Sequence, residues 1–244
     1  MRILFAGEEP VGGSSNYLLG VLKTIRADVV HVPSTKRLRP SLLKRRYDLF
    51  LFSDFPKAHL PVTAERAVVR QVQRGAGLLM IGGWASFAAP RGGWRGSAIA
   101  SLLPVACRRR DDRVNIPGGA LIVRQQDHPI VRGIPFTTPP AVIGLNAIRP
   151  KAGSRVVLRA RPIVPRGARV TLARHAYPLL VVNGSGGRRA ALATDAAPHW
   201  CGGLLDWGAR RLTIRVAPHA TIEVGHLYVR FLTNLIRWLV GCVP

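Results

Sequence analysis

The chain has 244 residues, of which 48% are hydrophobic, and its formal net charge at pH 7 is +24. This length accommodates one large α/β domain or at most two small ones, and we expect a single domain over residues 1–244. No run approaches the roughly 18 consecutive apolar residues of a membrane span, and the first apolar run, Ile3 to Gly7, is too short for a signal peptide. These properties predict a cytoplasmic protein without a membrane partner.

Strands alternate with helices through the first hundred residues. Continuous apolar runs predict strands of a parallel sheet, and apolar residues at helical spacing predict amphipathic helices. The predicted strands are Arg2 to Ala6, Val29 to Val32, Asp48 to Ser53 and Gly77 to Ile81; the predicted helices are Asn16 to Ile25 and a segment that Thr63 caps and that runs to about Arg74. This order requires right-handed crossovers and predicts a flavodoxin-like three-layer α/β/α sandwich around a mostly parallel sheet.

After Leu103 the pattern loosens into sequence rich in Pro, Gly and Arg. Residues 104–176 therefore indicate a β-rich but irregular basic excursion on the sheet. Its short β-like runs are Ala120 to Val123, Val142 to Leu145, Arg155 to Leu158 and Arg169 to Leu172. A β-hairpin is predicted next. Its strands are Pro178 to Val182 and Arg189 to Thr194, and its turn is Gly184 to Gly187. Helical spacing of apolar residues predicts a last helix over about Gly225 to Val240.

The positive charge is spread along almost the whole chain. Of the 36 basic residues 31 are Arg and five are Lys, and their runs are not interleaved with aromatic residues as a single-strand stacking surface requires. No helix-turn-helix or zinc finger accompanies them. The charge therefore predicts a solvated basic surface with weak attraction to polyanions, and no specific nucleic-acid partner.

The three cysteines are Cys107, Cys201 and Cys242, and none belongs to a Cys-x-x-Cys pair or a His-rich neighbourhood. This spacing indicates neither a disulfide framework nor a structural zinc site. We expect reduced thiols, no metal and no cofactor.

The segment from Gly75 to Phe87 contains the strongest indication of a site. A buried strand ends there in Gly82 and Gly83, and Trp84 follows at the carboxyl edge of the predicted sheet, where α/β proteins usually bind ligands. The turn contains neither a cysteine nor a Gly-x-Ser-x-Gly sequence. The two glycines allow a sharp turn whether the segment is functional or structural.

Seven motifs follow one another along nearly the whole chain. They are Gly77 to Phe87, Leu103 to Val105, Asp111 to Arg113, His128 to Ile130, Gly144 to Asn146, Pro178 to Val182 and Asp195 to Trp200. This set resembles the bacterial putative glutamine amidotransferase family, which is similar to trehalose-utilisation-type proteins within the class I glutamine amidotransferase-like superfamily. The resemblance implies a flavodoxin-like class I amidotransferase fold. Enzymes of that class use an elbow cysteine activated by a histidine, and this chain lacks the cysteine, so thiol-dependent glutamine hydrolysis is not expected.

Asp195 and His199 are the candidates for an orienting acid and its general base. A hydrolytic role then needs Ser86 or a bound water as the nucleophile. The alternatives are that His199 is a packed, hydrogen-bonded loop corner and that Asp195 caps a turn. Cys201 as a displaced nucleophile is a weaker alternative, because residues so close along one segment point apart.

Substrate contacts are expected from the turn and from acidic or basic residues near the same edge. The candidates are Glu8, Gly82, Gly83, Trp84, Asp111, Asp112 and Arg113. For the last three the alternative is an internal Asp–Arg ion pair that braces the excursion. His128 and Asn146 are assigned no role.

Two functions of different class remain open. The first is a hydrolase or carbohydrate-related enzyme that uses the Asp/His pair. The second is a non-catalytic module of the same fold that binds a small molecule or a partner. In both cases the expected partner is a small-molecule substrate or ligand, and a homo-oligomer is compatible with an open sheet.

Overall fold

The computed structural model of the chain describes residues 1–184 and 187–242. One half of its main sheet is parallel. In spatial order this half consists of β2 (Asp28–Val32), β1 (Arg2–Gly7), β3 (Leu49–Ser53), β4 (Gly77–Ile81) and β12 (Arg189–Leu192). Every residue of β3 and β4 is buried, as expected for parallel strands covered on both faces. The four strands predicted in the first part of the chain are confirmed.

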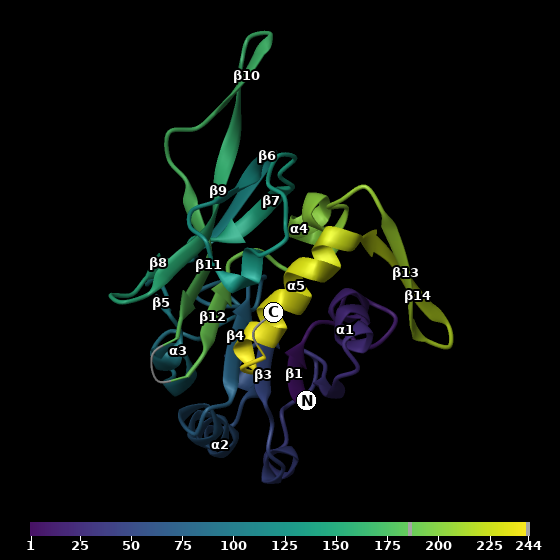
Figure 1. The fold of residues 1–244 in the computed structure, drawn as a ribbon. Coiled ribbons are helices and arrows are strands. Elements are labelled where there is room, and N and C mark those ends of the chain that lie inside the picture. The colour runs from purple at the N-terminus through teal and green to yellow at the C-terminus, as the bar shows by residue number, and fades with distance from the viewer. Residues whose placement is uncertain (185–186, 243–244) are drawn as a thin grey trace.

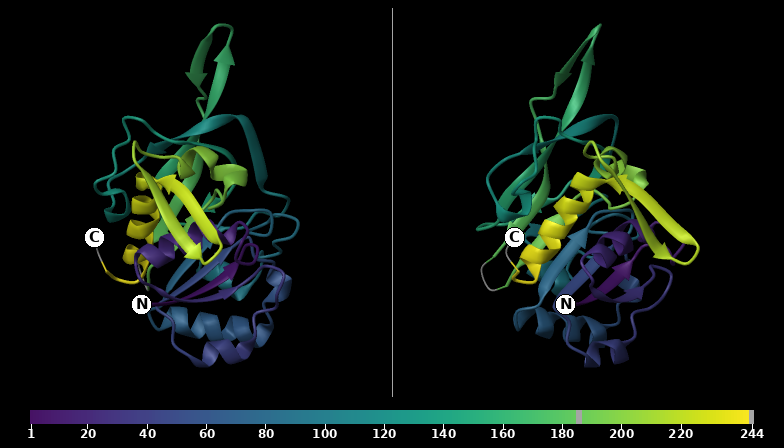
Figure 2. Two further views of the ribbon diagram at one scale, coloured as in Figure 1. Left: turned by 90° about the vertical axis from the view of Figure 1, so that its right-hand side faces the viewer. Right: turned by 45° about the vertical axis from the view of Figure 1, so that its right-hand side comes forward.

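Helices cover both faces of this parallel half, as Figures 1 and 2 show. α1 (Ser15–Thr24) and α5 (His226–Leu239) lie on one face, and α2 (Val62–Gln73) and α3 (Ala98–Leu102) on the other. The short 3-10 helices are η1 (Pro40–Lys44), η2 (Lys57–His59) and η3 (Pro129–Val131). The predicted helices corresponding to α1, α2 and α5 are confirmed. Pro61 precedes the first residue of α2, so Thr63 lies inside the helix and is not its cap.

The main sheet is mixed rather than mostly parallel, because its second half is antiparallel. Beyond β12 follow β11 (Tyr177–Asn183), β9 (Arg155–Arg166), β6 (Arg113–Arg124) and β7 (Ala141–Asn146), while β10 (Arg169–Leu172) pairs with β9 alone. β5 (Val105–Ala106) and β8 (Arg149–Pro150) form a separate pair. The antiparallel pairing of β11 with β12 confirms the predicted hairpin, although residues 185 and 186 of its turn lie outside the described residues.

The segment 104–176 is therefore regular, which corrects the expectation of an irregular excursion. In β9, Leu158, Ala160 and Pro162 are buried, whereas the intervening Arg159 and Arg161 are partly exposed. This alternation is that of a strand with one face on the core. Beyond the predicted β-like run Arg155 to Leu158, the next buried positions are Ala160 and Pro162 between arginines, so the sequence does not indicate that the strand continues.

Several elements were not predicted: α3, β5, β8, the 3-10 helices and three larger ones, a helix and two strands. α4 (Pro198–Leu205) follows β12 and packs against β7, and it places His199 in the first turn of a helix rather than in a loop. β13 (Arg211–Ala217) and β14 (Ala220–Gly225) form a hairpin that contacts α1. Figure 2 shows this hairpin and the ribbon of β9 and β10 extending from the body of the molecule.

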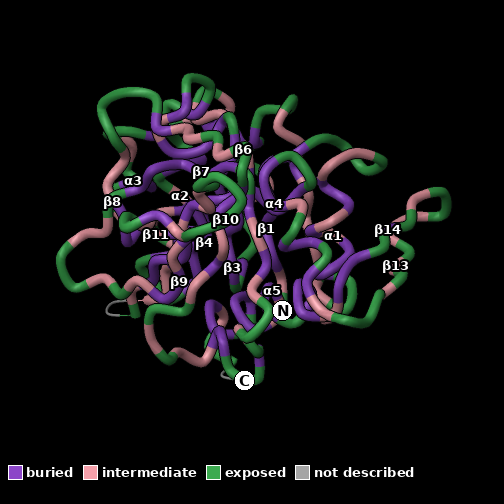
Figure 3. Tube along the Cα trace, turned by 90° about the horizontal axis from the view of Figure 1, so that it is seen from above, coloured by how far each residue is buried: buried purple, intermediate pink, exposed green. Residues whose placement is uncertain are grey.

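The core follows the sheet and the inner sides of its helices, where the buried segments are concentrated in Figure 3. Its largest fully buried side chain is Trp94. The Trp94 indole N–H donates to the carbonyl oxygens of Phe55 at 2.9 Å and Ala85 at 3.2 Å. This residue therefore ties the segment after β3 to the turn after β4. None of the described helices is both long and apolar enough to cross a membrane.

Candidate functional site

The carboxyl ends of β1, β3, β4 and β12 meet at one edge of the sheet, and polar or flexible residues follow each of them. Glu8 follows β1, Asp54 follows β3, Gly82 and Gly83 follow β4, and Asp195 comes shortly after β12. The backbone φ angles of Glu8 and Asp54 are +58° and +48°, in the left-handed region that non-glycine residues rarely adopt. Such strained positions occur preferentially at functional sites, which supports this edge as the candidate site.

An open crevice of about 640 Å³ lies at this edge. Its lining combines apolar side chains with a carboxylate, a guanidinium and an imidazole. The lining residues are Asp54, Trp84, Arg91, Asn115, Pro117, Ile143, His199 and Trp200. None of these described lining residues is a cysteine or a serine. Trp84 is 49% exposed, which is unusual for so large an apolar side chain.

Asp54 is held firmly against the turn that follows β4. The backbone N–H of Ala85 donates to its Oδ1 atom, and its own N–H donates to the Oγ of Ser86 at 3.1 Å. Burial raises the pKa of the Asp54 carboxyl, while the Ala85 amide and the electrostatic influence of His199 and Arg91 oppose this shift. The carboxyl is therefore positioned as an acid–base group beside an imidazole and a guanidinium.

His199 lies at the rim of the crevice but is not paired with Asp195. The imidazole is exposed and makes no hydrogen bond with the described residues. The buried carboxylate of Asp195 instead accepts the backbone N–H groups of Trp200 at 3.1 Å and Cys201 at 3.0 Å. Asp195 thus satisfies amide donors at the start of α4, a contact that fixes the helix turn carrying His199.

Ser86 lies beneath the turn rather than on the crevice wall. It is 1% exposed, and its hydroxyl donates to the carbonyl oxygen of Ile81 at 2.6 Å while accepting the Asp54 N–H. Both hydrogen-bonding roles of the hydroxyl are therefore used in holding β3 and β4 together. The structure does not bring Ser86, Asp195 and His199 into one hydrogen-bonded chain.

A buried polar pair braces the same turn from the antiparallel half of the sheet. Asn146 donates from Nδ2 to the Asp112 carboxylate at 2.8 Å, and its Oδ1 accepts the Gly83 N–H at 2.9 Å. Asp112 also accepts the Ala88 N–H at 3.0 Å. Asp112 and Asn146 are 1% and 0% exposed. Asp112 therefore stabilises the turn after β4 through its hydrogen bonds with Ala88 and Asn146. Asn146, to which the sequence analysis assigned no role, contacts Gly83 of that turn directly.

Asp111 and Arg113 form an ion pair, which is the structural alternative stated for this cluster. The Arg113 Nη2 lies 2.7 Å from the Asp111 Oδ2, and the two side chains are partly exposed. The Arg113 guanidinium also lies over the Trp84 ring, 4.5 Å from its centroid. The ion-paired Arg113 guanidinium therefore packs on one face of the Trp84 ring, and Trp84 lines the crevice.

Gly83 is required where it stands, so its replacement tests the geometry of the turn. Its φ is +146°, and a Cβ there would lie 2.6 Å from the Asp54 Oδ1. We expect Gly83→Ala to lower the free energy of unfolding by about 3 kcal/mol through backbone strain and displacement of Asp54. The matched control is Gly93→Ala, which shares a positive φ (+63°) but has its nearest contact at 3.9 Å. Urea denaturation showing equal losses for both variants contradicts this account.

Glu8 and Asp195 are buried acids behind the crevice. The Ser53 hydroxyl donates to Glu8 Oε1 at 2.5 Å. Burial raises the pKa of Glu8 to about 7, and burial together with the charge of Glu8 raises the pKa of Asp195 to about 8. Burial therefore favours the protonated form of both carboxyls relative to exposed acids, and the charge of Glu8 adds to this effect at Asp195.

The sequence analysis missed the carboxylate that does line the crevice. Asp54 follows the apolar strand Leu49–Ser53 directly, in the same position relative to β3 as Gly82 has relative to β4. That position is a signal that could have found it. Arg91, Asn115, Ile143 and Trp200 carry no comparable signal, because they reach the crevice only through loops, β6, β7 and α4.

Comparisons with known proteins agree on the type of fold. A family model described as "Putative glutamine amidotransferase" matches residues 14–214. Two cytoplasmic proteins of Salmonella typhimurium, STM3548 and STM1381, are similar in structure with TM-scores of 0.72 and 0.71 and sequence identities of 22% and 24%; each alignment covers 98% of this chain and 99% of the other. A putative ThuA-like protein of Parabacteroides merdae has a TM-score of 0.58 at 15% identity, covering 99% of this chain and 90% of that one. The comparison with curated proteins found no match.

Proposed function

Since this chain belongs to the putative glutamine amidotransferase family, we propose that it binds a small hydroxyl-rich molecule of the carbohydrate class in the crevice at the carboxyl edge of its sheet. The exposed Trp84 ring beside the Asp54 carboxyl is the observation that carries this proposal. An aromatic face packs against the apolar face of a sugar, while carboxylate, guanidinium and imidazole groups bind hydroxyls.

The proposal uses no thiol nucleophile, because none of the described residues that line the crevice is a cysteine. Burial raises the pKa of Cys201 well above its usual value, and its Sγ donates to the Ala197 carbonyl oxygen at 3.0 Å. Burial likewise raises the pKa of Cys107 to about 11. A thiol must ionise to attack an amide, so neither cysteine is suited to glutamine hydrolysis at neutral pH.

A second candidate function is hydrolysis in the same crevice, favoured by the closeness of Asp54 and His199. Both side chains line the crevice, and His199 influences the pKa of the Asp54 carboxyl electrostatically. In this proposal His199 activates a water while Asp54 stabilises the imidazolium or donates a proton. Asp195 and Ser86 are then positioning residues: Asp195 fixes the start of α4, and Ser86 fixes Asp54.

Binding of glucose and of a glucose disaccharide tests these proposals by ligand-observed NMR. We expect Trp84→Ala to weaken binding about tenfold, because the aromatic contact is lost. Val170→Ala is the control, since Val170 is 70% exposed on β10, outside the crevice. Binding without sugar release favours the non-catalytic module, whereas disaccharide cleavage that His199→Ala abolishes favours the hydrolase. Absence of binding to either sugar, or equal binding by the wild type and Trp84→Ala, contradicts the carbohydrate proposal.

We also propose that the protein acts in the cytoplasm. The support is that its two structural neighbours from Salmonella typhimurium are cytoplasmic proteins.

A further inference from the structure

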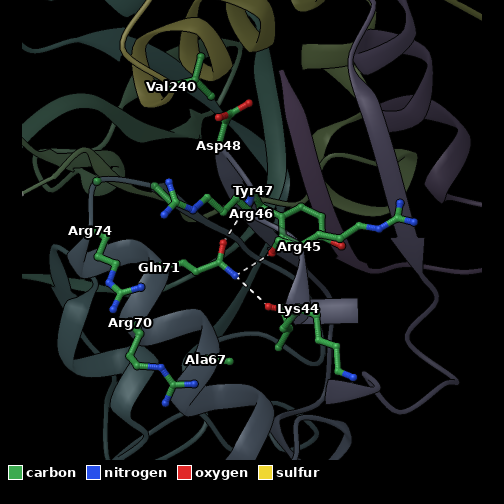
Figure 4. A pocket seen from close by; sticks show the side chains of 13 residues that line it. Lys44, Arg45, Arg46, Tyr47, Asp48, Ala67, Arg70, Gln71, Arg74 and Val240 are labelled. Atoms are coloured by element: carbon green, nitrogen blue, oxygen red, sulfur yellow. Dashed lines mark hydrogen bonds between the residues drawn. The ribbon is translucent and has the colours of Figure 1, made fainter. Parts of the chain in front are cut away.

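A second hollow, of about 600 Å³, lies at the amino end of β3, opposite the crevice at its carboxyl end. One wall is the segment that leads from η1 into β3, and the other is the last turn of α2. Its polar lining is dominated by basic side chains, which Figure 4 shows. They are Lys44, Arg45, Arg46, Arg70 and Arg74.

The five basic side chains divide into two groups around Gln71. In Figure 4 Arg46, Arg70 and Arg74 extend on one side of Gln71, while Lys44 and Arg45 extend on the other. All five are exposed, and none forms an ion pair or side-chain hydrogen bond with the described residues. The three arginines on the first side are therefore available to a ligand with several negative charges.

Gln71 fixes the two walls relative to each other. Its Oε1 accepts the Tyr47 N–H at 3.0 Å, and its Nε2 donates to the carbonyl oxygens of Leu43 at 3.2 Å and Arg45 at 3.0 Å. Tyr47, 4% exposed, anchors the same wall through its hydroxyl, which donates to the Leu42 carbonyl oxygen at 3.0 Å. The backbone that carries the arginines is thus organised before any ligand binds, which lowers the entropic cost of binding.

The charges are not balanced within the hollow. Asp48 is the single acidic residue among its described lining residues, and its Oδ2 already accepts the backbone N–H of Arg2 at 2.7 Å. Arg70 lies in the last turn of α2 and Arg74 is the residue that follows its last turn. Cations at this end of a helix interact favourably with the helix dipole. That effect explains two of the arginines but not Arg46, which comes from the opposite wall.

We propose that this hollow binds a compact ligand with two or more adjacent phosphate groups through Arg46, Arg70 and Arg74. The guanidinium group presents parallel N–H donors that match pairs of phosphate oxygens, and three such groups suit a linked series of phosphates better than a single one. A volume of about 600 Å³ suits a small molecule. The site is separate from the crevice, so it does not depend on the function proposed there.

Calorimetric titration with inorganic tripolyphosphate at 150 mM salt tests the proposal. We expect the double variant Arg70→Gln/Arg74→Gln to bind at least tenfold more weakly than the wild type. The control Lys44→Gln/Arg45→Gln removes the same charge from the same hollow on the other side of Gln71, and we expect a loss of less than threefold. Orthophosphate is expected to bind at least tenfold more weakly than tripolyphosphate.

Three results would overturn the proposal. Equal losses in the two double variants indicate attraction to net charge alone. Equal affinity for orthophosphate and tripolyphosphate removes the requirement for adjacent phosphates. Tighter binding of a 12-nucleotide RNA, lost in Arg70→Gln/Arg74→Gln, assigns the surface to a nucleic acid instead. Urea denaturation of each variant establishes that a loss of binding does not reflect unfolding.

Discussion

Replacement of Asn146 by alanine is expected to lower the free energy of unfolding by about 3 kcal/mol, measured by urea denaturation at pH 7. The side chain is 0% exposed and contacts both Gly83 and Asp112. Its loss leaves the Gly83 N–H unsatisfied and removes a donor from a buried carboxyl. Burial already raises the pKa of Asp112, and the Asn146 hydrogen bond opposes that shift. The unpaired polar groups, rather than the lost volume, dominate the expected cost.

The matched control is Asp111→Ala, one residue from Asp112 in the chain. It removes a carboxylate whose ion pair with Arg113 is partly exposed. Exposed pairs contribute little, so we expect a loss below about 1 kcal/mol. If Asp111→Ala lowers the free energy of unfolding as much as Asn146→Ala does, the buried hydrogen bonds of Asn146 to Gly83 and Asp112 contribute no more than a surface ion pair.

Glu8→Gln is expected to stabilise the protein at pH 8 by about 3 kcal/mol while changing little at pH 4. Burial raises the pKa of Glu8 from 4.5 to about 7, and each pKa unit corresponds to about 1.4 kcal/mol. Because the folded state favours the protonated acid, the contribution of Glu8 is fully present below about pH 4.5 and is lost as the pH rises through about 7. Glutamine cannot ionise, and its Oε1 still accepts the Ser53 hydroxyl.

The measurement is the difference in free energy of unfolding between Glu8→Gln and the wild type from pH 4 to 8.5. Glu9→Gln is the control, because it removes the same charge from the neighbouring, exposed position. A difference for Glu8→Gln that stays constant with pH, or that favours the wild type at pH 8, shows that folding does not raise the pKa of Glu8.

The parallel half of the fold was predictable because its strands are continuous apolar runs. Leu49 to Ser53 and Gly77 to Ile81 are buried at every position, so their composition alone identifies them. Beyond the hairpin of β11 and β12, the antiparallel half was identified only as short β-like runs. In β9 the inward positions include Ala160 and Pro162 while arginines face outward, so the signal of alternation is weak. The pairing of β6 with β9 joins residues far apart in the sequence, so a short stretch of sequence does not reveal it.

The part of the site that follows the carboxyl end of β4 was predictable from the sequence. The Gly82–Gly83 turn predicted the location of Trp84, which the structure places on the crevice wall. The pairing of Asp195 with His199 was expected because both follow a late strand, in a motif that carries the family resemblance. In the structure α4 turns the imidazole outward, and the first amides of that helix bind the Asp195 side chain. A helix start within a Gly- and Ala-rich segment has few apolar markers, so its effect on side-chain direction was not visible.

The ribbon of β9 and β10 affects whether copies of this protein aggregate. Among the described strands its outer strand, β10, pairs only with β9, and it carries a 70% exposed Val170; an open edge and an exposed apolar side chain are features through which edge strands join into aggregates. At its tip Arg166 lies directly opposite Arg169. A second copy approaching this edge meets like charges before any backbone hydrogen bond forms. The arginines therefore protect the edge electrostatically, and this protection weakens as salt screens the charges.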